Sequence, residues 1–177
     1  AVLTGGRNVA LLAQQALALG AQTAVIADAA LTQDLRDALA GSGIEAIGGR
    51  QALIEAAGRP ADWVMSAVVG FAGLEMSLAA AKSASVLALA NKESLVCGAG
   101  LLPALCAKHD TKLLPVDSEH SAIFQLLLGE HRDAVERVIL TASGGPFRNM
   151  LREDMAAVTP EQAGATPNWD MGQRIYI

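Results

Sequence analysis

Two carboxylates lie two residues apart in the run DSEH, Asp117 to His120, directly after the apolar residues 112–116. We predict that residues 112–116 form a strand, where side chains two apart point to the same side, so Asp117 and Glu119 could converge on one point. Hard oxygen ligands without cysteine favour Mg²⁺ or Mn²⁺ over structural zinc, although such ions need further ligands. The alternative is a pair of acids at a helix start that Ser118 caps. His120 is expected to orient a neighbour rather than bind metal.

A second polar group, Asn91-Lys92-Glu93, follows the predicted strand at residues 85–89. A cation between two polar residues at a strand end could anchor a phosphate or a hydroxyl-rich ligand. The alternative is a solvated helix start in which Asn91 caps the helix and Glu93 complements the helix dipole. A lysine in the first turn opposes that dipole, which favours a role in binding.

The first predicted strand ends in Thr4-Gly5-Gly6-Arg7-Asn8. In dinucleotide-binding folds an acid at such a position accepts the ribose 2′-hydroxyl, whereas an arginine accommodates a 2′-phosphate. Arg7 without an acid therefore favours NADPH over NADH, if a nicotinamide cofactor binds. An ordinary glycine turn before a helix capped by Asn8 is an equal alternative. The glycine-rich G-x-G-x-x-G loop is absent, and we expect it one strand earlier, before Ala1.

Two further glycine-containing loops follow predicted strands. Ser143, with the two glycines after it, could form an anion-binding nest for a phosphate at the end of residues 137–142, or simply a turn. Gly70 and Gly73 follow residues 63–69, the strongest candidate for a buried strand, and could admit a cofactor or only allow tight helix packing.

Short apolar strands alternate with longer helical stretches along the whole chain. The predicted strands lie at residues 1–4, 23–26, 44–47, 63–69, 85–89, 112–116 and 137–142. The predicted helices lie at residues 8–19, 31–39, 51–57, 73–82, 94–108 and 121–128, and a last helix starts at Thr159. The helix at residues 94–108 is expected to bend at residues 98–100. This order predicts a parallel sheet with right-handed crossovers, whose ligands bind beyond the carboxyl ends of the strands. We expect an α/β fold: an incomplete Rossmann-like parallel sheet in residues 1–110, followed by the start of an α/β catalytic domain in residues 111–177.

Composition restricts the class of protein. The 177 residues carry a net charge of −5, which argues against a nucleic-acid or anionic-membrane partner. No apolar run approaches the roughly 20 residues of a membrane span, and no signal-peptide pattern is visible. The two cysteines predict reduced thiols and a cytoplasmic location. Both ends read as interrupted elements, so we expect the chain to be part of a longer protein.

Four motifs in fixed order point to one family. They are ANKESLV at 90–96, LPVDSEHSAIFQ at 114–125, TASGGPFR at 141–148 and PNWDMG at 167–172. Together they resemble 1-deoxy-D-xylulose 5-phosphate reductoisomerase, and the resemblance extends over essentially the whole chain. The middle two motifs are long and specific.

The resemblance implies a set of roles. It places the adenosine end of NADPH at Gly6, Arg7 and Asn8, and its nicotinamide side at Asn91, Glu93 and Gly172. It assigns the metal, Mg²⁺ or Mn²⁺, to Asp117 and Glu119. It implies that the substrate is bound by Lys92, Ser118, Glu119, Thr166 and Ser143, with Ser143 near the phosphate. Lys92 and Glu119 would also be the catalytic residues.

The resemblance also implies the reaction. In this family the metal chelates the ketone and hydroxyl oxygens of a small phosphorylated sugar, the carbon skeleton rearranges, and hydride from NADPH reduces the resulting aldehyde to 2-C-methyl-D-erythritol 4-phosphate. The expected enzyme belongs to the non-mevalonate isoprenoid pathway and is a homodimer when full length.

Departures from the family pattern keep two rival hypotheses open. Three parts of the family pattern lie outside the chain. They are the first strand with its glycine-rich loop, the segment after Ile177 with the third metal carboxylate, and a C-terminal helical domain. Thr166 stands where the family has a substrate-binding histidine, and a threonine cannot carry charge. One rival is a semialdehyde-type NADP-dependent dehydrogenase, which the metal pair disfavours. The other is an inactive fragment or a degenerate ligand-binding homologue.

Overall fold

The computed structural model describes residues 1–140 and 145–165, and the chain divides into two compact units, residues 1–121 and 122–177. The first unit contains six strands within the described residues: β1 (Val2–Gly5), β2 (Thr23–Ile26), β3 (Glu45–Gly48), β4 (Ala61–Ser66), β5 (Ala84–Leu89) and β6 (Lys112–Pro115). Every strand pairing is parallel, as predicted. The expectation of an α/β fold with parallel sheets is therefore confirmed.

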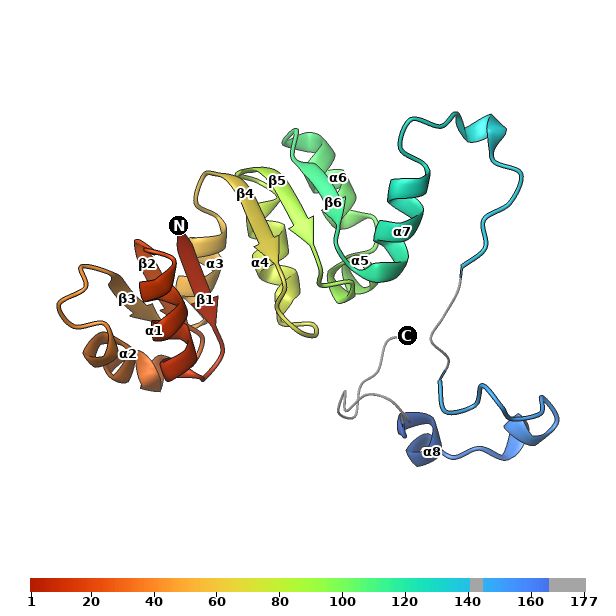
Figure 1. Cartoon of the computed structure of the whole chain (residues 1–177), viewed down its shortest axis with the longest axis horizontal. Coiled ribbons are helices and arrows are strands. Elements are labelled where there is room, and N and C mark those ends of the chain that lie inside the picture. Colours follow the sequence, from red (N-terminus) through yellow and green to blue (C-terminus); the bar gives the residue numbers. More distant parts are fainter. Residues whose placement is uncertain (141–144, 166–177) are drawn as a thin grey trace. The chain divides into compact units, whose positions relative to one another are not determined.

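The strands form two three-stranded sheets, β1-β2-β3 and β4-β5-β6, rather than the single sheet that the alternation predicted (Figure 1). No strand pairing joins β1 to β4 in the described chain, so each sheet has an unpaired edge there. Between these edges lies a cavity of ≈ 810 Å³, lined by residues of both strands. The predicted parallel sheet is thus interrupted between β1 and β4, and each of the two three-stranded sheets keeps the parallel order.

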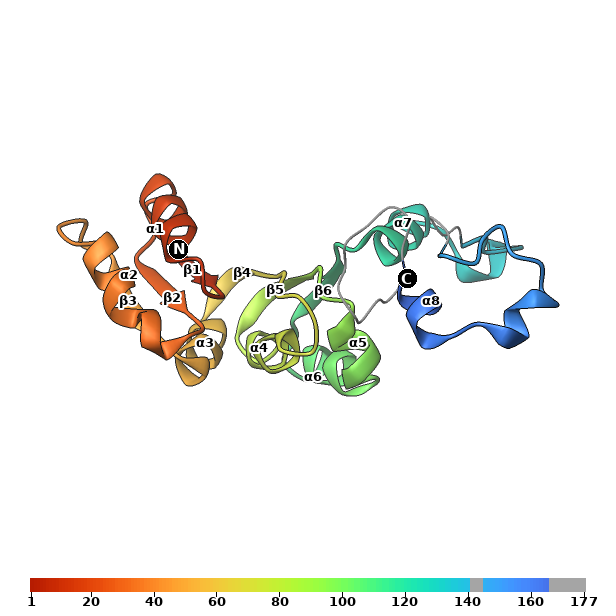
Figure 2. The same cartoon turned by 90° about the horizontal axis from the view of Figure 1, so that it is seen from below.

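The crossover helices cover both faces of the first sheet (Figure 2). They are α1 (Val9–Ala18), η1 (Ala29–Leu31), α2 (Thr32–Ala38) and α3 (Arg50–Ala57). Successive residues of a strand face opposite sides, and here Ala24 and Ile26 pack with α1 and α2 while Val25 packs with α3. All four residues of β2 are therefore buried, as expected of a central parallel strand.

The second sheet has α4 (Gly73–Ala80), α5 (Glu93–Gly98) and α6 (Leu101–Lys108) on one face (Figure 2). Leu87 and Leu89 of β5 pack there against Leu102 and Cys106 of α6. The other face is open at β4, where Trp63 is 54% and Met65 48% exposed. The prediction of a buried strand at residues 63–69 is thus wrong in its burial, because this face is open at Trp63 and Met65, and in its end, because β4 ends at Ser66.

Helix boundaries differ from the predictions at two places. The expected bend at residues 98–100 is a break between α5 and α6, where Ala99 adopts a positive φ of 40°. The helix expected to start at residue 121 begins three residues earlier, as α7 (Ser118–Leu126). This shift changes the geometry of the two carboxylates, as described below.

The second unit contains little regular structure in its described residues. It holds η2 (Arg132–Ala134), η3 (Asp154–Ala157) and α8 (Pro160–Gly164). The start of α8 was predicted correctly, and the Thr159 hydroxyl accepts a hydrogen bond from the Gln162 amide in a capping box. The predicted strand at 137–142 is wrong for its described part, since residues 137–140 pair with no strand and Val138 and Ile139 are exposed. Among the described residues, no helix is long and apolar enough to cross a membrane.

Gly48 offers a test of the first sheet's packing. A Cβ at this position would overlap Thr32 Oγ1 and lie 3.2 Å from Ile26 Cγ2, and the Thr32 hydroxyl is held by the Ala29 carbonyl at 2.7 Å. We predict that Gly48→Ala lowers the free energy of unfolding by about 1–3 kcal/mol, the usual cost of overpacking. Urea unfolding measures it. The matched control is Gly100→Ala, whose Cβ would meet nothing within 4 Å, and equal stability of the two variants would contradict the prediction.

Candidate functional site

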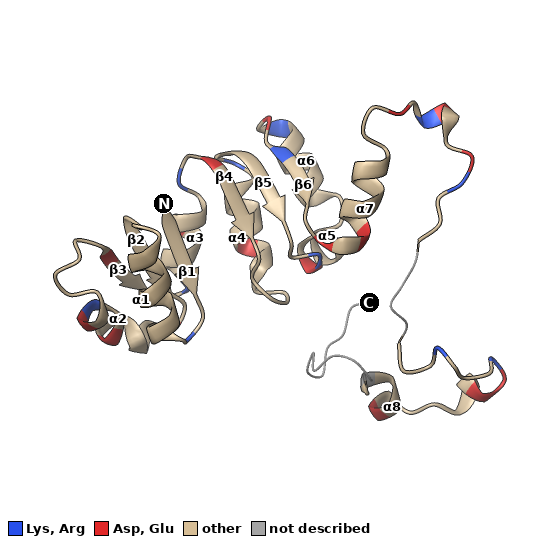
Figure 3. Ribbon diagram, viewed as in Figure 1, with Lys and Arg blue, Asp and Glu red and all other residues tan. Residues whose placement is uncertain are grey.

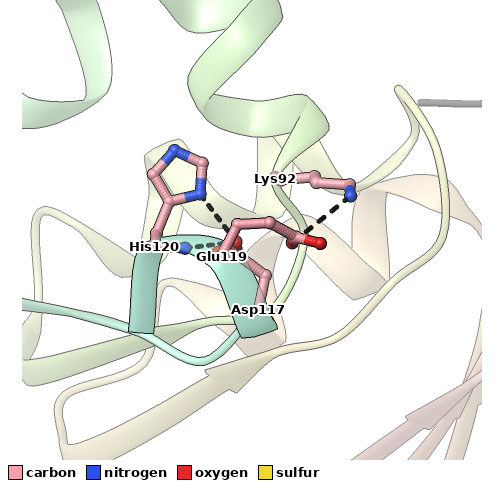
Figure 4. Close-up of polar contacts among 4 residues, drawn as sticks. All are labelled: Lys92, Asp117, Glu119 and His120. Atoms are coloured by element: carbon pink, nitrogen blue, oxygen red, sulfur yellow. Dashed lines mark hydrogen bonds and ion pairs between the residues drawn. The ribbon is translucent and has the colours of Figure 1, made fainter. Parts of the chain in front are cut away.

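Parallel pairing brings two of the predicted strand-end groups together. Leu89 at the end of β5 lies opposite Pro115 at the end of β6, and the Val116 amide donates to the Leu89 carbonyl at 2.9 Å. The chain continues from these strands into α5 and α7, so Lys92 and Glu119 stand side by side with 3.8 Å between Nζ and Oε2 (Figure 4). Both side chains are partly exposed, at 26% and 34%, and so remain accessible to a ligand.

Asp117 occupies the bend before α7 and caps the helix. Its Oδ2 accepts the His120 amide at 3.1 Å and contacts His120 Nδ1 at 2.6 Å. The structure therefore agrees with the expectation that His120 orients a neighbour, and Asp117, not Ser118, is the capping side chain. The argument from strand spacing is wrong, because Ser118 and Glu119 already belong to the first turn of the helix.

One oxygen of Asp117 has no partner in the described chain. The side chain is only 7% exposed, and Oδ1 is buried without a hydrogen bond from any described residue. A buried polar atom without a partner costs about 1–3 kcal/mol, and more when it is charged. Such an oxygen suits a bound cation, and a hard carboxylate oxygen suits Mg²⁺ or Mn²⁺. The residues present thus fit a divalent metal at Asp117.

The ligand set is incomplete within the part of the chain that the structure describes. No group of three histidine, cysteine, aspartate or glutamate side chains there could hold a metal ion. Asp117 and Glu119 are the two carboxylates at hand, and Figure 4 shows Lys92 beside one and His120 beside the other. A metal at this position would take its remaining ligands from elsewhere.

Local hydrogen bonds favour the ionised form of Glu119. Its own backbone amide is the main cause that lowers the pKa of the carboxyl, and the Ser118 hydroxyl and Lys92 act in the same direction. Partial burial and the charge of Asp117 oppose this shift in pKa. Glu119 is therefore available as an anionic ligand at neutral pH.

Asn91 is buried beneath the same site. Its amide nitrogen donates to the Val68 and Gly70 carbonyls and to Glu93 Oε2, at 2.6, 3.0 and 3.0 Å, and its oxygen accepts from Ser94. The predicted contact of Asn91 and Glu93 with the nicotinamide stays a prediction. The structure shows that the Asn91 side chain already joins the loops that follow β4 and β5.

The first strand-end group lies beside an acid that the sequence reasoning missed. Arg7 Nη1 is 2.7 Å from Asp28 Oδ2, and Arg7 is 79% exposed. Asp28 follows β2 as Arg7 follows β1, and pairing of the two strands aligns their ends. An acid directly after the next strand was the available signal, so the statement that Arg7 has no acid beside it is wrong. Asn8 caps α1 as expected, accepting the Leu11 amide at 3.0 Å.

Three predicted site residues lie outside the described residues: Ser143, Thr166 and Gly172. Their roles stay predictions. Gly6 lies in the loop between β1 and α1, as predicted, and a Cβ there would meet nothing within 4 Å, which leaves room for a ligand.

Comparison with known proteins decides the family. Residues 1–100 match the family model for 1-deoxy-D-xylulose 5-phosphate reductoisomerase, and residues 113–177 match that of the enzyme's C-terminal domain. The chain belongs to the 1-deoxy-D-xylulose 5-phosphate reductoisomerase family. The resemblance drawn from the four motifs is confirmed.

Reductoisomerases from two bacteria illustrate the similarity. Those of Ruegeria pomeroyi and Rhodospirillum centenum are 58% and 59% identical over 175 residues, which is 99% of this chain and 44% of each relative. The chain therefore spans less than half the length of these relatives.

Solved structures show the same fold. The Zymomonas mobilis reductoisomerase in complex with NADPH is 54% identical with a TM-score of 0.82, over 92% of this chain and 43% of that one. A reductoisomerase in complex with NADPH, fosmidomycin and magnesium is 33% identical with a TM-score of 0.77, over 97% of this chain and 45% of that one.

The incomplete carboxylate set generates a prediction about metal binding. We expect the 177-residue chain to bind Mn²⁺ weakly, because the described residues form no group of three carboxylate, histidine or cysteine side chains that could hold a metal ion. Asp117→Asn should weaken that binding by at least about tenfold, or 1.4 kcal/mol, since a neutral amide replaces the buried charged oxygen. Water-proton relaxation in a Mn²⁺ titration measures the affinity. Asp110→Asn, an exposed acid just before β6, is the control. Tight stoichiometric binding by the unsubstituted chain would show that the ligand set has been misassigned.

Proposed function

We propose that this protein, in its full length, converts 1-deoxy-D-xylulose 5-phosphate to 2-C-methyl-D-erythritol 4-phosphate with NADPH and Mg²⁺ or Mn²⁺. The observation that carries the proposal is the meeting of Lys92, Glu119 and the unpartnered Asp117 oxygen at two adjacent strand ends, in a chain of this family. Related structures contain NADPH, magnesium and fosmidomycin. Residues 1–177 would supply the cofactor-binding region and part of the catalytic site.

Each side chain at this centre has a separate task in the proposed reaction. Asp117 and Glu119 would hold the cation, which when bound would supply Lewis-acid polarisation of the substrate's ketone oxygen. His120 holds Asp117 in place through Oδ2 and leaves Oδ1 free to face the cation. Lys92 would bind an anionic or hydroxyl oxygen of the substrate.

The remaining substrate contacts are proposed from the family resemblance. Ser118 precedes Glu119, and its hydroxyl helps to lower the pKa of that carboxyl. Ser143 would bind the phosphate, and Thr166 would supply one hydrogen bond where the family has a histidine. Gly172 would contact the cofactor, as would Asn91 and Glu93 at its nicotinamide end.

At the adenosine end, Gly6, Arg7 and Asn8 would contact NADPH. Arg7 is exposed and its guanidinium is held by Asp28 on one side, which directs the remaining N–H groups outward. A 2′-phosphate would be bound by these groups. The carboxylate of Asp28 would at the same time weaken phosphate binding by repulsion.

The division into a cofactor-binding domain at residues 1–110 and a catalytic domain from residue 111 remains our proposal. The edges of β1 and β4 are unpaired, and a cavity of ≈ 810 Å³ lies between them. Both observations support the presence of an additional strand in the cofactor-binding domain of the full-length protein. We propose that in the full-length protein one more strand lies between these edges and leads into the glycine-rich pyrophosphate loop. It would convert the two sheets into the continuous sheet that the alternation of elements predicted.

Cellular context and assembly are also proposals. Both cysteines are free in the structure, which agrees with the reducing cytoplasm. A phosphorylated sugar is the expected partner, and the net charge of −5 disfavours nucleic acid. The homodimer rests on the family resemblance alone.

Arg7 should determine the choice of cofactor. The test uses an extended chain, defined as residues 1–177 joined at both ends to the corresponding segments of the Zymomonas mobilis reductoisomerase. Arg7→Ala should weaken NADPH binding by about tenfold or more, because a charge-assisted hydrogen bond contributes about 1.5–3 kcal/mol, and leave NADH binding nearly unchanged. Asp28→Asn should strengthen NADPH binding instead, since it removes the repelling carboxylate. Cofactor fluorescence titration measures these affinities. Equal losses for NADPH and NADH would show that Arg7 does not contact the phosphate.

Activity should require the longer protein. The 177-residue chain should show no NADPH oxidation with 1-deoxy-D-xylulose 5-phosphate, because positioning of metal, phosphate and hydride donor together supplies much of the rate. The extended chain should be active, and Thr166→His should lower its KM by adding a donor that can carry charge beside an anionic substrate. An inactive extended chain, even with histidine at position 166, would favour the alternative of a degenerate ligand-binding homologue. Turnover by the 177-residue chain would contradict the need for the missing segments.

A further inference from the structure

Four buried polar residues form a hydrogen-bonded network below the candidate site. Ser66 ends β4, Ser77 lies in α4, and Asn91 and Ser94 lie at the start of α5. Ser66 Oγ is 2.8 Å from Ser77 Oγ, and Ser77 Oγ is 3.1 Å from Ser94 Oγ. The Ser94 hydroxyl donates to Asn91 Oδ1. The network thus runs from the end of one strand to the loop that follows the next.

The direction of these hydrogen bonds determines how the Asn91 amide is oriented. Its Oδ1 accepts from both the hydroxyl and the backbone amide of Ser94. Its NH₂ group must therefore face the opposite way, toward the Val68 and Gly70 carbonyls and Glu93. An amide has two acceptor lone pairs and two N–H donors, so this arrangement engages all of them, with one N–H shared between two of the three acceptors. The proposed contact of Asn91 with the nicotinamide would therefore be made by its backbone or by van der Waals packing, not by a further side-chain hydrogen bond.

The network connects two loops at the carboxyl ends of neighbouring strands. One is the 67–72 loop between β4 and α4, and the other is the 90–92 loop between β5 and α5, which carries Lys92. The approach is close, because a Cβ at Gly73 would lie 2.8 Å from Asn91 Cγ. A displacement of the Asn91 amide would therefore move Lys92 relative to Glu119, which belongs to the neighbouring strand-end loop.

We propose that Ser77 and Ser94 are positioning residues that act through Asn91 to fix the backbone of Lys92 and Glu93. Buried polar networks are directional, whereas an apolar packing of the same volume would not define the rotation of the amide. Their effect on turnover rests on the proposed function. Their effect on loop geometry does not.

Hydrogen exchange on the 177-residue chain tests the geometry. Ser77→Ala and Ser94→Ala should each accelerate amide exchange in residues 67–72 and 90–94 by about tenfold, because the loops lose a shared restraint. Exchange in β1–β3 should not change. The control is Ser83→Ala, whose hydroxyl bonds the Ala79 carbonyl at 3.4 Å, outside both loops.

Two results of this experiment would overturn the proposal. The first is unchanged exchange in both loops of both variants. The second is acceleration spread evenly over the whole chain, which would indicate general destabilisation. Ser77→Thr keeps a hydroxyl at the same place and should restore exchange to that of the unsubstituted chain. Since two serines are tested separately, the failure of one variant to fold leaves the other to decide.

Kinetics of the extended chain test the consequence for catalysis. Ser77→Ala should lower kcat on the order of tenfold with a smaller change in the KM for 1-deoxy-D-xylulose 5-phosphate, because a misplaced group costs rate more than binding. Ser77→Thr should recover kcat, and Ser83→Ala should leave it unchanged. Unaltered kcat and KM in Ser77→Ala would overturn the positioning role. If the unsubstituted extended chain is inactive, the proposed function fails, and the exchange measurement still decides whether the serines fix the loops.

Discussion

The parallel pairing of β5 with β6 is the contact on which the candidate site depends. It places Leu89 opposite Pro115, so that the chain leaves both strands at the same edge and enters α5 and α7 there. Lys92 and Glu119 are far apart in sequence and meet only because of this register. Since one residue of slip would turn every side chain to the other face, the buried Leu87 and Leu89 hold the register by packing against α6. The apolar core thus determines the distance between two charged groups.

Burial of polar groups near this edge follows two patterns. In the serine and asparagine network every donor and acceptor of the Asn91 side chain is satisfied, and Asn91 joins the loops that follow β4 and β5. At Asp117 one carboxylate oxygen is satisfied by His120 and the other is not. Figure 3 shows acidic and basic residues close together at the start of α5 and α7. The unsatisfied oxygen lies where a cationic ligand would compensate its desolvation.

Much of the fold was predictable from the sequence, because it depends on local patterns. The strands β1 to β6, the cap at Asn8 and the start of α8 at Thr159 all follow from apolar runs and capping residues within a few positions. Burial at Trp63 was not predictable in this way. An apolar side chain does not reveal whether its strand has neighbours on both sides, and β4 is an edge strand.

The candidate site was predictable in its members but less in its geometry. The types and order of Lys92, Asp117 and Glu119 identified the strand-end groups, whereas the pairing of Arg7 with Asp28 depends on strand register that local sequence does not encode. The position of the two carboxylates stayed open between an extended segment and a helix start, since nothing local distinguished a strand end from the first turn of α7. The serine network carried no signal, because small polar residues on three separate elements meet only in the folded chain.

The two carboxylates at the edge differ in how firmly their partners hold them. Lys92 and Glu119 are 3.8 Å apart and partly exposed, and such pairs contribute only about 0–1 kcal/mol. Asp117 is 7% exposed and is held at 2.6 Å by His120 as well as by the helix amide, so its displacement would leave a buried charge unpaired. In the proposed reaction Asp117 would hold a divalent cation without rearranging, and Glu119 could leave Lys92 at little cost to act as a second ligand. Lys92 would bind an anionic oxygen of the substrate.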